Sequence, residues 1–449
     1  PTSARGYARA RGSYMSLPLA PAIRSSEEGL AQGLPLRVLT VSSVFPNAVQ
    51  PVFGTFVLER VRAMARMAEV RVAAPVAWFP DWFRPAPYRW RRHAGIPHVT
   101  ELAGVRVFHP RRLVIPRIGR AANAQAYRRA LSWTVRAALA EAPVDIIDAH
   151  FVWPDGHAAV EVGREFGIPV SITGHGSDLT YAPQFAVVGA QTRTALRHAN
   201  QVLTVSRSLA RLAERLGADP QRVAVVPNGV DLDRFRPPAD RRSARRSLGL
   251  ADSARLVVGV GALVRHKGFD AAIEALATRK LSGARAPLLV LVGDGPERRR
   301  LQQLAEKLRV AHRVRFCGSR SHAEVARWMG VADALLLPSH REGWPTVLFE
   351  AWACGTPIVA TPVHGVPEAF DRPGLGILLR DRMPETVADA LATVLAQRWD
   401  PAPMRAYASS HTWDDVARRT LGQLRRVAGL PWSAATDSEW EAWTTRQMS

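Results

Sequence analysis

Two glutamates, Glu342 and Glu350, lie in a segment whose residue types suit the binding of a phosphorylated ligand that carries hydroxyl groups. The apolar run 334–337 predicts a buried strand, and Pro345 suits the first turn of a helix that stops before Gly355. The start of a helix presents unpaired backbone N–H groups and a partial positive charge, which bind a diphosphate without a metal ion. A carboxylate on either side accepts hydrogen bonds from sugar hydroxyls. The segment therefore predicts a site that binds a nucleotide sugar.

The alternative interpretation makes Glu342 a solvated loop residue and Glu350 an ordinary helical residue. The surrounding sequence favours ligand binding, because 358–360 predicts a second strand and 364–367 a second tight loop on the same side. In an open α/β sheet, ligands bind beyond the carboxyl ends of the strands, where such loops gather. Since several local signals agree, we favour the functional interpretation.

A second group of candidate phosphate ligands follows the predicted strand 256–260. Lys267 stands before a glycine and a predicted helix, where an ammonium group can neutralise a phosphate; a solvated lysine is the alternative. Arg265 is the neighbouring candidate. The loop that contains Gly293 and Gly295 is a turn by composition and a candidate for contact with the nucleotide, although its GDGP sequence alone is a weak signal.

Candidate residues for the opposite wall of the site come from the first half of the chain. His175 stands between glycines directly after a predicted strand, where it can donate a hydrogen bond to a hydroxyl or a phosphate oxygen. Asp178 either caps the following turn or touches the ligand. His150 also follows a predicted strand, but the neighbouring Trp153 and Pro154 allow a purely packed histidine.

The elements that position these residues form two series of short apolar strands with helices between them. The first series comprises residues 36–41, 69–74, 105–108, 144–148, 169–172, 202–205 and 223–226, with helical patterns at 56–67, 128–141 and 192–198. The second comprises 256–260, 288–292, 314–316, 334–337, 358–360 and 376–379, and a last helix at about 413–427. This alternation predicts an α/β protein of two doubly wound, Rossmann-like domains that face one another across a cleft.

A Pro- and Arg-rich interval after residue 230 marks the boundary between the domains, which we place at 36–229 and 230–410. Residues 1–35 and 429–449 are predicted to be a disordered extension and a tail. The segment 76–93 interleaves aromatic residues with arginines. It suits either a membrane interface or groove for a lipid-linked glycan, or a surface loop with packed tryptophans.

The formal net charge is +21, from 60 Lys and Arg against 39 Asp and Glu. Such a charge favours nucleic acid, an anionic membrane surface or phosphorylated ligands as partners. No helix-turn-helix, zinc-finger or RNA-binding signature occurs, so we expect no nucleic acid. Asp231 and Asp233 resemble a metal-binding pair, but after Asn228-Gly229 they are better interpreted as loop and helix-cap residues.

The chain contains two cysteines, Cys317 and Cys354, too few for a disulfide framework or a zinc site. No apolar run approaches the ~18 to 20 residues of a membrane-spanning helix, and the N-terminus lacks a signal-peptide core. We therefore expect a cytoplasmic protein that is at most peripheral to a membrane.

The sequence resembles glycosyltransferase family four, a group of retaining, metal-independent enzymes with the GT-B double Rossmann fold. The resemblance runs from about residue 36 to 427 and rests on EGWPTVLFEAWACGTPIVAT, TGHGSDL, VVPNGVDLDRF, VGDGP and the loop ending HKG. It implies transfer of a sugar from a nucleoside-diphosphate-sugar to a glycan or a lipid-linked acceptor, without a cofactor. A non-catalytic nucleotide-sugar or glycan-binding protein on the same fold is the alternative.

The resemblance also implies roles for single residues. Glu350 would bind the ribose, Glu342 the hydroxyls of the donor sugar and Lys267 the diphosphate, while His175 would bind the sugar or its phosphate. Further implied positions are the phosphate-cradling backbone of Pro345, Thr346 and Val347, the acceptor-side glycine Gly54 near the diphosphate, and Trp413 as the start of a helix, about 411–428, that crosses back to the first domain.

One position departs from the family pattern. Many members carry an arginine after the glycine that ends the first strand of the second domain, where it helps the lysine to hold the diphosphate. Here Ala262 stands at that position. Arg265 would replace the missing arginine if its loop folds inward.

Overall fold

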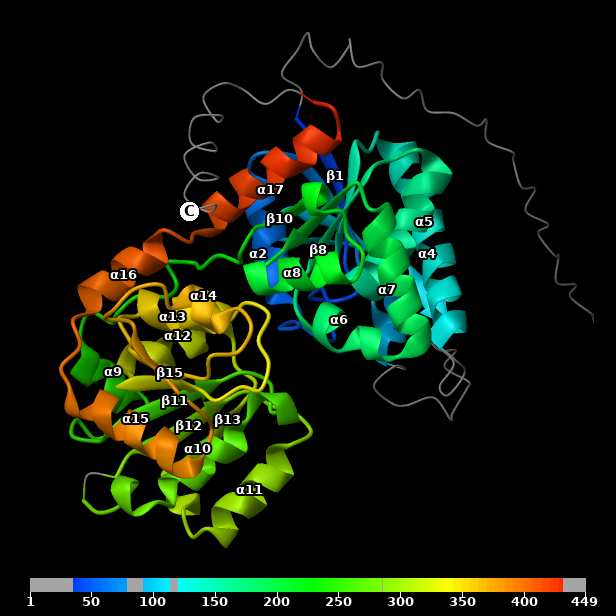
Figure 1. Ribbon diagram of the computed structural model, residues 1–449. Helices are drawn as coiled ribbons and strands as arrows, with labels where there is room; N and C mark the ends of the chain where they lie inside the picture. The colour runs from blue at the N-terminus through cyan, green and yellow to red at the C-terminus, as the bar shows by residue number, and fades with distance from the viewer. Residues whose placement is uncertain (1–34, 79–91, 114–119, 285, 431–449) are drawn as a thin grey trace, which may run out of the picture.

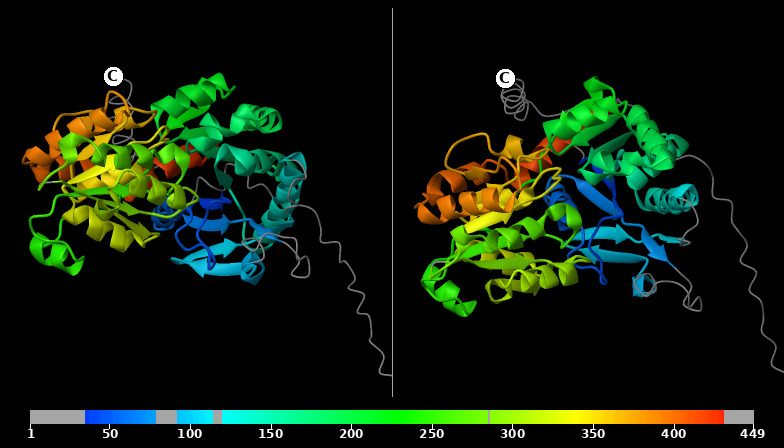
Figure 2. Two further views of the ribbon diagram at one scale, coloured as in Figure 1. Left: turned by 90° about the horizontal axis from the view of Figure 1, so that it is seen from below. Right: turned by 60° about the horizontal axis from the view of Figure 1, so that its bottom comes forward.

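The computed structural model describes residues 35–78, 92–113, 120–284 and 286–430. The predicted extension 1–35 and the tail 429–449 lie almost wholly outside the described residues. The same holds for the greater part of the aromatic and arginine-rich segment 76–93, of which 79–91 is not described. Two α/β lobes make up the described chain, as the two turned views also show (Figures 1 and 2).

The first lobe is built on a sheet of eight strands. Almost all residues of its central strands are buried, the apolar ones together with several polar ones, as expected for a sheet that is covered on both faces. All neighbours run parallel except the last pair, which is antiparallel. The strand order is β10 (Val223–Val225), β9 (Gln201–Thr204), β8 (Val170–Gly174), β7 (Ile146–His150), β1 (Arg37–Val41), β2 (Glu69–Ala73), β5 (Val105–Phe108) and β4 (Val99–Leu102).

The second lobe holds a sheet of six parallel strands. Its order is β13 (Val314–Gly318), β12 (Leu288–Val292), β11 (Leu256–Val260), β14 (Ala334–Leu337), β15 (Ile358–Ala360) and β16 (Gly376–Leu378). A small separate sheet pairs β3 (Val76–Trp78) with β6 (Arg111–Leu113). The two doubly wound sheets confirm the fold class that the strand spacing predicts.

Helices cover both faces of each sheet, so each lobe has three layers (Figure 1). In the first lobe α2 (Thr55–Met64) and α17 (Trp413–Val427) cover one face, and α4 (Arg120–Glu141), α5 (His157–Phe166), α7 (Ala186–His198) and α8 (Arg207–Arg215) the other. In the second lobe α9 (Arg241–Ser247), α12 (His322–Val331), α13 (Thr346–Ala353) and α16 (Pro401–Ser409) lie opposite α10 (Phe269–Leu276), α11 (Arg298–Lys307) and α15 (Pro384–Ala396).

The chain crosses between the lobes twice, along neighbouring paths. Val230 forms a parallel bridge with Thr412, and its backbone N–H donates to His411 O at 2.8 Å. Directly after this crossing, α17 returns to the first lobe and packs beside α2 (Figure 1). Thr412 and Asp415 form a capping box that fixes where α17 begins.

Several element boundaries differ from the sequence-based prediction. β7 runs over Ile146–His150 instead of 144–148, because the carboxylate of Asp145 binds both the backbone N–H and the guanidinium of Arg37 at the entry to the strand. Helices α4 and α7 begin earlier than predicted. The antiparallel edge strand β4 and the pair β3 and β6 were not predicted. β4 and β6 contain polar residues and have no buried position, and the three residues of β3 were assigned to the aromatic and arginine-rich segment 76–93.

The lobes also touch away from the two crossings. The carboxylate of Glu368, in the short helix α14 (Val366–Ala369), accepts hydrogen bonds at 2.7 Å from the backbone N–H groups of Arg207 and Ser208. These N–H groups belong to the start of α8 in the other lobe, where a carboxylate is favoured by the helix dipole. Glu368 follows β15 and α8 follows β9, so this contact joins the two lobes on the side where the loops after the strands of both sheets lie.

Candidate functional site

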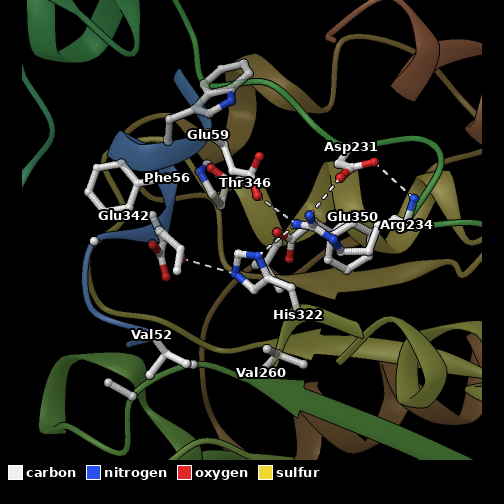
Figure 3. A pocket seen from close by; sticks show the side chains of 18 of the residues that line it. Val52, Phe56, Glu59, Asp231, Arg234, Val260, His322, Glu342, Thr346 and Glu350 are labelled. Atoms are coloured by element: carbon white, nitrogen blue, oxygen red, sulfur yellow. Dashed lines mark hydrogen bonds and ion pairs between the residues drawn. The ribbon is translucent and has the colours of Figure 1, made fainter. Parts of the chain in front are cut away.

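A cavity of about 430 Å³ lies between the two lobes, at the carboxyl ends of the strands of the second sheet (Figure 3). The first lobe contributes the beginning of α2 and the residues before it. The second lobe contributes the end of β11, the loop after β14 and the beginning of α13. Lining residues that the sequence singled out as site residues are Gly54, Lys267, Glu342, Pro345, Thr346, Val347 and Glu350.

The start of α13 faces this cavity. Pro345 precedes the helix as its N-cap, and Thr346 is its first residue. Glu350 is four residues further on, so it lies one turn along the same helix face. The helix therefore presents its partly positive start and a carboxylate to the same cavity, as the sequence predicts.

Lys267 and Glu342 are in direct contact in the cavity. Nζ of Lys267 lies 2.7 Å from Oε1 of Glu342, and the same oxygen accepts a hydrogen bond of 2.6 Å from Ser339. Both side chains are largely buried, with exposed fractions of 18% for Lys267 and 9% for Glu342. An ion pair with so little solvent screening holds the ammonium group in a defined place at the cavity wall.

Arg234 is a cavity residue that we did not single out from the sequence. Its guanidinium lies 2.8 Å from Oε1 of Glu59 and 3.1 Å from Oδ2 of Asp231, and it donates to Nδ1 of His322 at 3.3 Å. Nε2 of the same imidazole lies 3.2 Å from Oγ1 of Thr55. Figure 3 shows Arg234 at the centre of this group. Because Thr55 and Glu59 belong to α2, the group connects the two lobes across the cavity.

The sequence held only an indirect signal for this group. Arg234 stands in the family-like string VVPNGVDLDRF, but nothing in that string pairs it with Glu59 or His322. Asp231 behaves as predicted for a loop residue, because its Oδ1 accepts from the backbone N–H groups of Asp233 and Arg234. Among the described residues, no group of three or more His, Cys, Asp or Glu side chains is arranged to hold a metal ion.

The pKa values of the cavity side chains depend on their burial and on the charges beside them. Burial raises the pKa of Glu350 to about 7; the charge of Arg234 opposes the rise and that of Glu59 adds to it. The pKa of Arg234 is raised above its usual value. Burial acts to lower it, but the hydrogen bond to Glu59 and the charges of Glu59 and Asp231 have the larger effect. For His322, burial and the charge of Arg234 lower the pKa. Hence Arg234 is cationic and His322 neutral at neutral pH, while Glu350 titrates there.

Gly54 fixes the approach of the first lobe to the cavity. It is the N-cap of α2 and has a φ of 73°, in the left-handed region. A Cβ at this position would come within 2.2 Å of Val44 O. Any side chain would therefore push the start of α2 away from the loop on which it rests.

Several predicted site residues do not line the cavity. The exposed Arg265 lies in a short turn, while Ala262 lines the wall, so the structure does not bring Arg265 into the place of the missing arginine. Gly293 and Gly295 lie behind the wall: a Cβ on Gly293 would come 1.9 Å from Gly261 O. The GDGP turn thus supports the loop 261–263 and is not part of the lining.

The two acceptor-side candidates other than Gly54 are buried outside the cavity. Asp178 is 3% exposed, and its carboxylate accepts hydrogen bonds from the backbone N–H groups of Val152, His175 and Gly176, so it acts as a cap and not as a cavity residue. His150 is completely buried, as the last residue of β7, in agreement with the packed alternative.

His175 also lies just outside the cavity lining. Its ring is 5.0 Å from that of Phe56, which does line the cavity. Its carbonyl oxygen lies against Gly343, where a Cβ would come within 1.9 Å of it. The histidine loop of the first lobe and the glutamate loop of the second lobe are therefore in contact.

The chain matches two sequence families that divide it between them. The family described as "Glycosyltransferase Family 4" matches residues 53–234, and the family described as "Glycosyl transferases group 1" matches residues 240–411. Among curated proteins, a putative teichuronic acid biosynthesis glycosyltransferase, TuaC, of Bacillus subtilis is 30% identical over 82% of this chain and 91% of its own length. D-inositol 3-phosphate glycosyltransferase of Jonesia denitrificans is 32% identical over 63% of this chain and 72% of its own length.

Solved structures share the fold. Sucrose-phosphate synthase of Thermosynechococcus elongatus superimposes with a TM-score of 0.70 at 23% identity, over 87% of this chain and 98% of that structure. HepE of Anabaena, in complex with UDP and glucose, superimposes with a TM-score of 0.66 at 18% identity, over 87% of this chain and 99% of that structure. At this level of identity the likeness establishes the fold, which is of the GT-B type.

Proposed function

Because the chain belongs to glycosyltransferase family 4, we propose that it transfers a sugar from a nucleoside-diphosphate donor to an acceptor hydroxyl with retention of the anomeric configuration. The observation that carries this proposal is the convergence of Lys267, Glu342, Glu350 and the start of α13 on one cavity. An ammonium group and a helix start suit a diphosphate, and two carboxylates suit the hydroxyls of a ribose and a sugar.

In the proposed reaction, the bond between the anomeric carbon and the phosphate oxygen breaks, and the acceptor oxygen bonds to the same face of that carbon. The acceptor proton passes to the departing phosphate oxygen. Negative charge on the diphosphate grows during this step, and Lys267 together with the start of α13 stabilises it. These groups supply the positive charge, so the proposal includes no metal ion. Activity that is unchanged after treatment with a chelator is the expected result.

Contacts between the lobes support the exclusion of water during this step. Arg234 joins Glu59 beside the cavity, and Glu368 joins the start of α8 at its margin. Exclusion of water strengthens electrostatic interactions and protects the donor from hydrolysis.

We propose a glycan or a lipid-linked glycan as the acceptor. The name of the Bacillus subtilis relative places that protein in teichuronic acid biosynthesis, and its similarity extends over most of both chains. None of the helices in the described part of the chain is long and apolar enough to span a bilayer. The net charge of +21 suits a peripheral position on an anionic, cytoplasmic membrane face. Binding to anionic vesicles that weakens as salt rises is the expected observation.

A donor screen tests the proposed function. The full chain is incubated with a panel of UDP- and GDP-sugars and candidate glycan acceptors, and the release of UDP or GDP is followed. One donor should yield acceptor-dependent release, and NMR of the product should show the anomeric configuration of the donor. Tight binding without release would identify a non-catalytic binding protein, and an inverted product would overturn the retaining mechanism.

A further inference from the structure

The carboxylate of Asp155 holds the segment that follows β1 in the first lobe. Asp155 is completely buried and lies in the helical turn Val152–Gly156, directly after β7. Its Oδ1 accepts a hydrogen bond from the backbone N–H of Ser43, and its Oδ2 accepts one of 2.9 Å from the hydroxyl group of the same serine. Both donors of Ser43 are therefore directed to one buried carboxylate.

Tyr127 fixes this carboxylate from another side. It is completely buried in α4, and its hydroxyl group donates a hydrogen bond of 2.5 Å to Oδ1 of Asp155. The guanidinium of Arg112, in β6, lies over the ring of Tyr127 at 5.2 Å from its centroid. Burial raises the pKa of Asp155 to about 6, and the hydrogen bonds from Tyr127 and Ser43 and the charge of Arg112 oppose the rise. Asp155 is therefore mainly ionised at neutral pH and accepts three hydrogen bonds.

The segment that Asp155 holds leads directly to the cavity between the lobes. The hydroxyl group of Ser42 donates to Val44 O at 3.0 Å and accepts from the backbone N–H of Val44 at 3.2 Å. Gly54 rests on the same Val44 O, since a Cβ on Gly54 would come within 2.2 Å of it. The lining residues that this segment and the start of α2 contribute are Val52, Gly54, Thr55, Phe56 and Glu59 (Figure 3). The position of Ser43 thus affects where the first-lobe wall of the cavity lies.

The groups that suit the diphosphate lie on the opposite wall. Lys267 follows β11, and the start of α13 follows β14, so both belong to the second lobe. A displacement of the first-lobe wall leaves these groups in place and changes the distance across the cavity. Small errors in that distance lower the rate of a reaction between two bound groups more than they lower the affinity for one of them.

We propose that Asp155 is a positioning residue for sugar transfer, which acts through Ser43 to hold the segment 43–54 and thereby the first-lobe wall of the cavity. Asp155 itself does not line the cavity, so its effect on the reaction is indirect. The reaction that the wall serves rests on the proposed function, whereas the hold on the segment does not. Loss of this hold should lower kcat and leave the affinity for the nucleoside diphosphate unchanged.

Asp145 supplies a matched control at the other end of β1. Its carboxylate accepts hydrogen bonds from the backbone N–H of Arg37 at 2.8 Å and from the guanidinium of Arg37 at 2.6 and 3.0 Å. Arg37 is the first residue of β1, whereas Ser43 comes two residues after its end, so the two aspartates hold opposite ends of one strand. Neither Asp145 nor Arg37 lines the cavity. Asp145→Ala therefore removes a comparable contact without moving the wall.

Steady-state kinetics and nucleotide binding of the full chain test the effect on the reaction. With the donor found in the screen, Asp155→Ala should lower kcat by about tenfold or more, and Asp145→Ala should leave it nearly unchanged. The Kd for UDP, or for GDP if the screen selects guanine, should be the same in both variants and in the unsubstituted protein. A loss of stability alone would not produce this difference between kcat and Kd.

Hydrogen–deuterium exchange tests the hold on the segment without any substrate. The backbone amides of residues 44–54 should exchange faster in Asp155→Ala and at the original rate in Asp145→Ala. Asp155→Asn is the conservative variant, because its amide oxygen accepts from Ser43 N–H and Tyr127, while its amide N–H₂ donates to the serine hydroxyl group. Asp155→Asn should therefore restore both the slow exchange and most of kcat.

Each alternative result has a definite meaning. Unchanged kcat in folded Asp155→Ala would overturn the proposal, as would an equal loss of kcat in Asp145→Ala or a loss of affinity for UDP that accounts for the whole effect. If Asp155→Ala does not fold, Tyr127→Phe and Ser43→Ala supply the test, since each removes one hydrogen bond of the carboxylate. Unchanged kcat in both would then contradict the proposal. Failure of the proposed function would instead appear as no release of nucleoside diphosphate by the unsubstituted protein, with the exchange result intact.

Discussion

Lys267 Nζ and Glu342 Oε1 lie 2.7 Å apart in the cavity between the lobes. The two residues are separated by 75 positions in sequence and come from the loops after two neighbouring strands, β11 and β14. In the proposed reaction this pair exchanges partners when the donor binds, since the ammonium group turns to the diphosphate and the carboxylate to the sugar hydroxyls. The carboxylate of Glu342 thus pairs with Lys267 in the free enzyme and accepts hydrogen bonds from the sugar in the proposed complex.

The first prediction concerns Glu342. Glu342→Gln removes the ion pair with Lys267 and a charged acceptor for sugar hydroxyls, so kcat/KM for the donor should fall by about a hundredfold or more. Glu385→Gln is the control, because Glu385 is an exposed glutamate of the same lobe. Steady-state release of the nucleoside diphosphate measures both. Similar kinetics in the two variants would remove Glu342 from the site.

The second prediction concerns the contact of Glu59 with Arg234. If this pair holds the lobes together at the cavity, Glu59→Gln and Arg234→Gln should each raise KM for the donor. The double variant should then show a coupling free energy of about 1 kcal/mol. Arg106 and Glu141 form an exposed pair at a similar distance, 2.7 Å, and serve as the control. We expect a coupling free energy near zero for this pair, because solvent screens it. Additive effects at Glu59 and Arg234 would argue against a role in holding the lobes.

The third prediction concerns the titration of Glu350, whose pKa is raised to about 7 by burial. The ionised carboxylate is the stronger acceptor for ribose hydroxyls, so KM for the donor should rise as pH falls through about 7. The pKa of the neighbouring His322 is lowered, and this group stays neutral over that range. Glu350→Gln should raise KM at every pH and flatten the profile. A profile that survives this substitution would assign the titration to another group.

The fourth prediction separates backbone strain from steric contact at Gly54. Gly54 and Gly104 have φ values of 73° and 76°, but a Cβ at Gly104 meets nothing within 4 Å. Gly104→Ala should therefore cost only about 1 kcal/mol in the free energy of unfolding. Gly54→Ala adds a clash with Val44 O and should cost about 3 kcal/mol and abolish transfer. Equal unfolding free energies in urea would show that the loop absorbs the added methyl group.

Local sequence patterns were enough to predict most of the fold and the second-lobe wall of the cavity. Short apolar runs mark the strands of both sheets, because strands buried on both faces carry little else. Glu342 and Lys267 lie in the segments that directly follow such strands, and Glu350 lies in the helix α13 that begins after the Glu342 loop. Their meeting in one cavity follows from parallel winding alone, since the carboxyl ends of parallel strands share one edge.

Contacts between distant segments were not predictable in this way. Arg234 is 175 positions from Glu59 and 88 from His322, and only the folded chain brings them together. The bounds of β7 were also not predictable. The strand begins and ends two residues later than predicted, so His150 lies at the end of a strand and not in a loop. Asp178 could not be assigned from its sequence position, since a cap and a ligand contact place an aspartate equally well after a glycine loop.

Acceptor-dependent release of nucleoside diphosphate by Lys267→Ala tests the central claim most directly. Lys280→Ala is the matched control, because Lys280 is 56% exposed and pairs with Asp389 on the surface of the same lobe. We predict that Lys267→Ala folds normally and loses release, whereas Lys280→Ala retains it. Full activity in Lys267→Ala would contradict the assignment of the cavity as the site of sugar transfer.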